Sequence, residues 1–324
     1  MKYIDINTSI VEMQTYLQEK IYFLNKNEQI TIIERPGEGN MNVVLRVKTT
    51  QRSFIVKQSR PYVEKFPTIK APINRIEVEN KFYSSMLKDN NFKYFPKILY
   101  YNFDEKLIIQ MDLGNRMNMT SIYNSSLLIE EDFLELINAL IVIHNSKAEK
   151  NYPKNRSLKK INHQHIFILP FIEKNGFLLN DIQSGLEVIA DRVIKNKTLA
   201  SKVIDVGNKY LEIGKNIIHG DFYPGSWIKS NGNLYVIDPE FSFIGRLEFD
   251  LGVMAAHLII ATSDISYIDK IEKQYPNTIN VKLFHQFTGI EIIRRIIGIA
   301  QLPMVRTLLE KEKLVKFAEK IILN

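Results

Sequence analysis

Two short stretches decide the fold: residues 217–227 read IIHGDFYPGSW, and residues 236–240 read VIDPE. Asp221 lies in a polar loop after an apolar segment, and Asp238 and Glu240 follow 17 and 19 residues later, at the end of a short predicted hairpin. Phosphoryl transfer needs these side chains, because one carboxylate accepts the proton of the acceptor hydroxyl and further oxygens hold Mg²⁺. The alternative is that these acids only terminate strands and turns. It explains Asp238 but not the spacing of all three acids. The spacing therefore predicts a phosphoryl-transfer site.

A glycine-rich stretch lies nearer the N-terminus, where residues 34–42 read ERPGEGNMN. Strands are predicted on both sides of it, at residues 29–34 and 42–47, because both segments are rich in β-branched side chains. This context does not fit the strand-to-helix fingerprint of dinucleotide-binding folds, and the Gly-Lys-Ser/Thr ending of a P-loop is missing. A glycine-rich hairpin is typical of the loop that covers nucleotide phosphates in kinase-like folds. A plain hairpin turn is the alternative.

Lys57 lies near the end of the next predicted strand, residues 53–58, and a helix is predicted over residues 74–87. A strand lysine after such a hairpin reaches the α- and β-phosphates when an acid on a helix holds it. Glu77 and Glu79 are the candidate acids, and because they lie about 200° apart around a helix only one of them can face the sheet. The alternative is a solvated lysine with two surface glutamates.

The chain changes character near residue 112. Short strands, among them residues 97–101 and 107–111, dominate before it, and apolar helical patterns dominate after it, with a polar surface loop expected at 151–160. This order predicts the α+β class: a small antiparallel β lobe with one helix over residues 1–112, followed by a larger, mainly helical lobe over residues 113–324.

Composition excludes several classes of protein. The 324 residues contain no cysteine, which rules out disulfides, a thiolate nucleophile and cysteine-ligated metal sites. The net charge of +7 is spread along the chain without a run of five basic residues, so we expect no nucleic-acid surface. The N-terminus has no signal-like segment, and the longest uncharged apolar stretch, residues 251–261, is too short to span a membrane. A cytoplasmic protein is expected.

Together these motifs resemble the aminoglycoside phosphotransferase/choline kinase superfamily, which has a bilobal, protein-kinase-like fold. Within it, the sequence resembles the methylthioribose kinases of bacteria and plants. Four stretches carry this resemblance: residues 37–42, 57–62, 219–252 and 291–300. Ser226, where most of the superfamily has asparagine, and Asp-Pro-Glu-Phe at 238–241 match the methylthioribose kinases in particular.

The resemblance implies a role for each matching residue. It makes Asp221 the catalytic base beside the acceptor, and makes Asp238 and Glu240 the ligands of Mg²⁺ at the ATP phosphates. It favours Glu77 as the partner of Lys57 at those phosphates. The other implied contacts are Gly37, Gly39 and Asn40 at the phosphates, Met111 and Asp112 at adenine, and Arg294 and Arg295 at the acceptor and phosphate.

The arginine pair also has a physical interpretation. Residues 292–300 predict an apolar helix face, and Arg294 and Arg295 fall on its opposite flanks, where both heads can turn to a cleft. Two ordinary surface arginines, with buried methylene groups and solvated guanidinium groups, would give the same pattern.

The implied activity is phosphorylation of a small-molecule alcohol or sugar by ATP with Mg²⁺: 5-methylthioribose to its 1-phosphate, a step of methionine salvage. No nucleic acid or membrane partner is expected, and a homodimer is left open. The sequence departs from methylthioribose kinases in three ways: residues 63–72 lack their tryptophan, Tyr223 replaces their usual histidine, and the chain is shorter. An aminoglycoside, choline, homoserine or another small alcohol therefore stays open as the acceptor, as does a nucleotide-binding pseudokinase.

Overall fold

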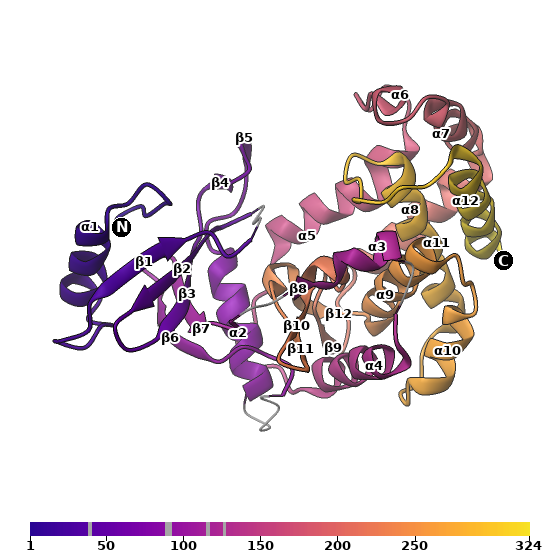
Figure 1. The fold of residues 1–324 in the computed structure, drawn as a ribbon. Helices are drawn as coiled ribbons and strands as arrows, with labels where there is room; N and C mark the ends of the chain where they lie inside the picture. The colour runs from indigo at the N-terminus through magenta and orange to yellow at the C-terminus, as the bar shows by residue number, and fades with distance from the viewer. Residues whose placement is uncertain (38–40, 88–92, 115–116, 126–127) are drawn as a thin grey trace.

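The computed structural model describes residues 1–37, 41–87, 93–114, 117–125 and 128–324. A five-stranded antiparallel sheet occupies the N-terminal third of the chain, in the order β1-β2-β3-β7-β6. Its strands are β1 (Ile30–Glu34), β2 (Val43–Thr49), β3 (Ser53–Gln58), β6 (Ile98–Asn102) and β7 (Leu107–Met111). Figure 1 shows this sheet at one end of the molecule and most of the helices at the other.

Two helices accompany the sheet. The first, α1 (Ile10–Thr15), was not predicted; Ser9 and Glu12 form a capping box at its start. The second, α2 (Arg75–Leu87), contacts β6 and β7 and also the turn at 239–241 in the second half of the chain. Helix α2 therefore joins the sheet to the rest of the molecule.

The remainder of the chain is mainly helical. Its helices are α3 (Ile122–Ser125), α4 (Glu130–Asn145), α5 (Arg156–His163), α6 (Leu179–Ile182), α7 (Leu186–Lys195), α8 (Lys197–Leu211), α9 (Leu247–Thr262), α10 (Tyr267–Gln274), α11 (Val281–Ile297) and α12 (Leu308–Leu323). Its short strands are β8 (Met117–Asn118), β9 (Asn216–Ile218), β10 (Trp227–Ser230), β11 (Asn233–Val236) and β12 (Phe243–Gly245). These elements confirm the predicted α+β class.

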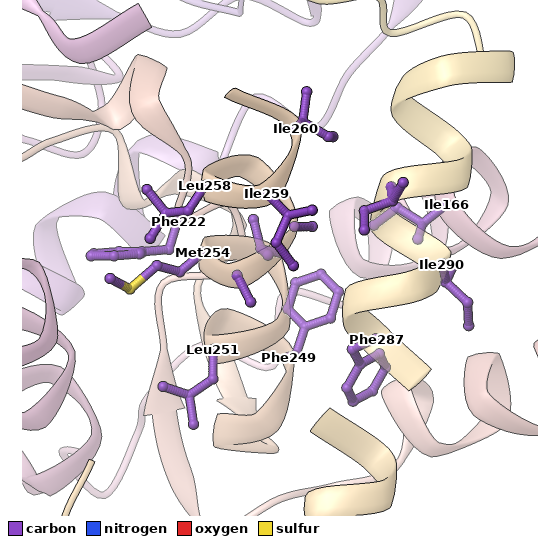
Figure 2. Close-up of a cluster of buried hydrophobic side chains, with 14 of the residues drawn as sticks. Ile166, Phe222, Phe249, Leu251, Met254, Leu258, Ile259, Ile260, Phe287 and Ile290 are labelled. Atoms are coloured by element: carbon purple, nitrogen blue, oxygen red, sulfur yellow. The ribbon is translucent and has the colours of Figure 1, made fainter. Parts of the chain in front are cut away.

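Helix α9 lies at the centre of the helical part, and its residues from Leu247 to Ala261 are all buried. Figure 2 shows its side chains pointing toward α11 on one side and toward Phe222 on the other. Phe249 meets Phe287 of α11 edge to face, with ring centroids 5.3 Å apart. A Cβ on Gly252 would lie 2.6 Å from the Cβ of Phe287, so glycine is what allows the two helices to approach this closely.

The buried apolar side chains form two main clusters. One lies within the sheet part and runs from Ile4 to Ile109; the other runs from Phe82 to Ile322 and takes in the inner face of α2. The lobe boundary at residue 112 stays a prediction. Among the described helices, none has the length and apolarity needed to cross a bilayer.

Two connecting segments differ from expectation. The prediction of a polar surface loop over 151–160 is wrong in its second half, because α5 begins at Arg156 and buries Leu158 and Lys159. The ammonium group of Lys159 donates to the carbonyls of Leu211 and Glu212 at the end of α8, which is why a lysine is buried there. Most of the segment 63–72 lies in a small hairpin of β4 (Tyr62–Val63) and β5 (Phe66–Lys70).

Candidate active site

Lys57 lies at the centre of one wall of the site. It shares a face of the sheet with its register partners Val44 and Ile108, and it is 2% exposed. Its ammonium nitrogen lies 2.6 Å from Oε1 of Glu79 and 2.6 Å from Oδ1 of Asp238. Burial alone would lower the pKa of Lys57, but these two carboxylates hold it above its ordinary value. The lysine therefore stays charged and joins the sheet to the second half of the chain.

The expected pairing of Lys57 with Glu77 is wrong. Glu79 is fully buried on the stripe of α2 that also carries Ile76 and Tyr83, whereas Glu77 lies on another face and is only half-buried. The apolar stripe turns toward the core, and Glu79 turns with it. The spacing of the buried apolar residues on α2 was the sequence signal that would have selected Glu79.

Asp238 follows β11 and adopts a left-handed backbone conformation with φ of +62°. Aspartate tolerates this region better than most residues. Its side chain is 49% exposed, so the carboxylate faces open space beside Lys57. This is a suitable position for a carboxylate that contacts a bound ion.

Glu240 lies two residues further on, in a buried position. Its Oε2 accepts a hydrogen bond from the amide of Asn42 at 3.1 Å and lies 3.3 Å from Nε of Arg75. Burial raises the pKa of Glu240 to about 8, with Arg75 and Lys57 opposing the shift. Neither Asn42 nor Arg75 was predicted as a site residue, although Asn42 ends the glycine-rich stretch.

Arg75 is fully buried and organises this end of the sheet part. It donates to the side chain of Asn42 and to the backbone carbonyls of Met41, Arg60 and Pro72. The end of the glycine-rich stretch is thus tied to Glu240. Of the predicted loop residues, Gly37 lines the cleft, whereas Gly39 and Asn40 lie outside the described residues.

The loop that carries Asp221 is fixed by side chains of its own half of the molecule. Asp250 of α9 accepts hydrogen bonds from the backbone N–H of His219 at 2.6 Å and of Gly220 at 2.9 Å, so it holds the loop backbone in place. Gly220 has φ of +82°, a conformation that favours glycine. The hydroxyl of Ser226 contacts the carbonyl of Asp221 at 2.9 Å, so it braces the loop.

Asp221 itself is 28% exposed, and its carboxylate faces a positively charged group. NH2 of Arg295 lies 3.7 Å from Oδ1 of Asp221. Burial raises the pKa of Asp221 above its ordinary value, with Arg295 and Arg294 opposing the shift. A carboxylate with a raised pKa accepts a proton more readily, as a general base requires.

Arg294 and Arg295 are buried, at 6% and 7% exposure, so the alternative of heads in water does not hold. From the sequence they were expected on opposite flanks of the helix, and the partner that they share was not identified. Glu291, one turn earlier on α11, accepts from Nε of Arg294 at 2.5 Å and from Nε of Arg295 at 2.8 Å. The spacing of three and four residues was readable in the sequence.

A cavity of about 520 Å³ lies between the sheet and the helical part. Its lining includes Gly37, Val44, Lys57, Gln110 and Asp238. Gln110 is 2% exposed, and its Oε1 has no hydrogen-bond partner among the described residues. A buried amide oxygen without a partner is costly, so a ligand donor is the natural group to meet it.

Met111 and Asp112, the residues expected at adenine, begin the linker that follows Gln110 of the cavity lining. The N–H of Met111 donates to the carbonyl of Lys97 at 2.8 Å, within the sheet. Asp112 forms a two-pronged ion pair with Arg46, with its oxygens 2.8 and 3.1 Å from Nε and NH2. Contact of the linker with adenine stays a prediction, and the N–H of Met111 takes no part in it.

Within the described ranges, no group of three or more acidic or histidine side chains is placed to hold a metal ion. Asp238, which contacts Lys57, and Glu240, two residues further on, supply two carboxylates after β11. This donor set suits Mg²⁺, which commonly takes one or two carboxylates and completes its shell with water and substrate phosphates.

Comparisons with known proteins agree on one class. No protein-family model matches the chain. It is 26% identical over 358 residues to the methylthioribose kinase of Bacillus cereus (strain AH187), covering 94% of this chain and 88% of that protein. It is 27% identical over 356 residues to the methylthioribose kinase of Bacillus mycoides (strain KBAB4), covering 92% and 86%.

The fold is that of solved small-molecule kinases. Choline kinase LicA from Streptococcus pneumoniae superposes with a TM-score of 0.53 at 16% identity, covering 96% of this chain and 98% of that one. A choline/ethanolamine kinase family protein from Mesorhizobium loti superposes with a TM-score of 0.56 at 12% identity, covering 97% and 95%. Fold and site therefore define a kinase-like phosphotransferase. Along more than nine-tenths of its length the chain is similar to methylthioribose kinases, as its motifs predicted.

The two glutamates of α2 offer a matched test of the Lys57 pairing. Glu79→Gln removes a buried charge that holds Lys57, and we expect kcat/KM for ATP to fall by about tenfold to a hundredfold, or about 1.4 to 2.7 kcal/mol. Glu77→Gln should stay within about twofold of wild type, because its carboxylate does not contact Lys57. Steady-state kinetics with varied Mg-ATP measure both; equal losses in the two variants would contradict the assignment.

Proposed function

We propose that the protein transfers the γ-phosphoryl group of ATP to a hydroxyl of a small sugar, and that this sugar is 5-methylthioribose, which becomes its 1-phosphate. The observation that carries the proposal is the contact of Lys57 with Asp238. It joins a sheet lysine to the acid that follows the Asp221 loop, on the wall of a single cavity. Similarity to methylthioribose kinases over more than nine-tenths of the chain supports the choice of acceptor.

The nucleotide side of the cleft suits ATP. Lys57 carries a fixed positive charge for the phosphates, and Gly37 leaves the cleft wall open beside it. The orphaned amide oxygen of Gln110 suits an adenine amino group, which donates hydrogen bonds. Asp238 and Glu240 would hold Mg²⁺, which when bound neutralises charge on the transferred phosphoryl group.

The chemical step then requires one base and one acceptor hydroxyl. The hydroxyl oxygen forms a bond to the γ-phosphorus while the bond from that phosphorus to the oxygen bridging to the β-phosphate breaks, and ADP leaves. Asp221 takes the hydroxyl proton. Since the transition state is loose, most of the rate enhancement comes from positioning and from charge stabilisation by Lys57 and Arg295.

The charge around Asp221 favours a neutral or anionic acceptor. Arg294 and Arg295 both raise the local positive potential, and the guanidinium carbon of Arg295 lies 5.1 Å from the ring centre of Tyr223. That ring is therefore already paired with a cation and is not free to bind the ammonium group of choline or an aminoglycoside. A sugar, and the phosphorylated product that it becomes, suit this environment better.

The hairpin at 62–70 stands where methylthioribose kinases carry their tryptophan loop. All of β5 is exposed, including the apolar side chains of Phe66 and Ile69 at 52% and 47%. We propose these as the side chains available to contact the methylthio group in place of tryptophan. We also propose a cytoplasmic enzyme that needs no nucleic acid or membrane partner.

Replacement of Asp221 tests the base directly. Asp221→Asn cannot take the proton, and we expect turnover to fall by about 10²- to 10⁴-fold. The affinity for Mg-ADP, measured by calorimetry, should stay within about twofold, because Asp221 does not bind the nucleotide. Turnover close to that of wild type in this variant would contradict the assignment.

The pH dependence of the reaction follows from the same carboxylate. Asp221 must be ionised to act, so kcat/KM for the acceptor falls as the pH drops through its pKa. Because burial raises that pKa, the fall should begin above the pH of about 4 that an ordinary aspartate gives. Initial rates at saturating Mg-ATP measure this profile, and a profile that stays flat down to pH 4 would count against it.

A panel of acceptors tests the substrate. With ADP release as the readout, 5-methylthioribose should exceed ribose by about tenfold or more in kcat/KM, the range that one small apolar group gives. Choline, an aminoglycoside and homoserine should be poorer still. Equal rates on ribose and 5-methylthioribose would overturn the choice of sugar, and ATP binding without turnover on any acceptor would favour the pseudokinase alternative.

A further inference from the structure

A buried chain of hydrogen bonds runs from α3 through α9 to α11. The hydroxyl of Tyr123 lies 2.6 Å from Nδ1 of His257, and Nε2 of His257 lies 3.0 Å from Oε1 of Glu291. The three residues are 2%, 0% and 1% exposed. None of them was predicted as a site residue.

Only one arrangement of protons satisfies this chain. Burial lowers the pKa of His257 to about 4, so its ring is neutral near pH 7 and carries one proton. The ionised carboxylate of Glu291 can only accept, so the proton lies on Nε2 and Nδ1 accepts from the hydroxyl of Tyr123. The chain therefore runs in one direction, from Tyr123 to Glu291.

This series of hydrogen bonds ends at Arg294 and Arg295. Burial acts to raise the pKa of Glu291, but Arg294 and Arg295 hold it well below its ordinary value. Its Oε1 accepts from both His257 and Nε of Arg295, and its Oε2 accepts from Nε of Arg294. These three donors fix the orientation of the Glu291 carboxylate. The carboxylate in turn holds the Nε–H group of each arginine.

The terminal nitrogens of Arg295 lie between Asp221 and the carbonyl of Ala300. While Nε is held by Glu291, the terminal NH2 of the same guanidinium lies 3.7 Å from Oδ1 of Asp221. The guanidinium carbon also lies over the ring of Tyr223, 5.1 Å from its centre. Rotation of Arg295 away from Asp221 would break its contact with Glu291.

A second chain of the same composition lies nearby. The hydroxyl of Tyr275 is 2.7 Å from Nδ1 of His144, and Nε2 of His144 is 3.2 Å from Oδ2 of Asp250. Asp250 in turn holds the backbone of the Asp221 loop. One tyrosine–histidine–acid chain thus fixes the loop backbone, and the other fixes the charge beside the carboxylate.

We propose that Tyr123, His257 and Glu291 are positioning residues for the reaction, which hold Arg295 in the one orientation that places its guanidinium beside Asp221. This inference rests on the proposed function, because it takes Asp221 as the base. It assigns to Tyr123 of α3 and His257 of α9 a part in the chemistry that the sequence motifs do not indicate.

Kinetic comparison of single and double variants tests the proposal. We expect Tyr123→Phe to lower kcat/KM for the acceptor by about threefold to tenfold and Glu291→Gln by about a hundredfold, with the affinity for Mg-ADP unchanged in both. Tyr267→Phe is the matched control, since it removes a tyrosine hydroxyl that lies outside this hydrogen-bond chain, and it should behave as wild type. Melting temperatures show which variants fold, and Tyr123→Phe keeps the test usable if Glu291→Gln does not.

A double-mutant cycle with Arg295→Ala shows through which group the chain acts. If the chain works through Arg295, Tyr123→Phe lowers kcat/KM in the wild-type background but has little further effect in the Arg295→Ala background. An equal loss in both backgrounds, or no loss in either, would overturn the proposal. Asp221→Asn in the same assay separates the two hypotheses: if it stays active, the proposed base is wrong; if it is inactive while Tyr123→Phe is unaffected, only the positioning role is wrong.

Nitrogen-15 spectra of the histidine rings give a readout independent of turnover. His257, assigned by the signal lost in His257→Gln, should be neutral with its proton on Nε2 from pH 6 to 8. In Glu291→Gln, where the amide can donate to Nε2, the Nδ1-protonated form should become detectable. A ring that is charged, or protonated on Nδ1, in the wild-type protein would contradict the chain.

Discussion

One buried ammonium group holds the two walls of the site together. Lys57 is almost completely removed from water and shares its charge with Glu79 from α2 and Asp238 from the helical half. A charge buried to this extent cannot be left without partners, because removal of one partner of a buried pair costs about 3 to 5 kcal/mol. The sheet, α2 and the loop after β11 are therefore positioned relative to one another by a single electrostatic requirement.

On the opposite wall the signs are reversed: a carboxylate is held by a positively charged side chain. There the partly buried charge is the carboxylate of Asp221, which faces Arg295, and the polar groups behind it have hydrogen-bond partners of their own. Asp250 fixes the backbone and Glu291 fixes the arginines. Fixed dipoles and charges need no reorganisation when charge moves in the transition state, which is the main way in which such a site accelerates transfer.

Much of this arrangement was readable from the sequence. β-Branched runs predicted the strands, and the spacing of Asp221, Asp238 and Glu240 indicated a phosphoryl-transfer site, because short local patterns decide both. Glu79 was missed in favour of Glu77 because a resemblance outweighed the apolar stripe of α2. The helix after residue 155 was missed because its polar composition hides a lysine that is buried by bonding to distant carbonyls.

The contacts between residues far apart in the sequence could not be predicted from it. Tyr123 and His257 are 134 residues apart, and no local pattern indicates that one hydroxyl meets one ring nitrogen. Asn42 and Glu240 are separated by 198 residues in the same way. By contrast, Glu291 lies one helical turn before Arg294 and Arg295, so its pairing with them was available from spacing alone.

The central claim is that the protein forms a phosphoester on a sugar hydroxyl. Phosphorus-31 spectra of the protein with Mg-ATP and 5-methylthioribose test it most directly, because they identify the bond that is made. We predict a new phosphate ester resonance that couples to the anomeric proton of the sugar and grows in equal amount with ADP. Inorganic phosphate as the only product that accompanies ADP would contradict the claim.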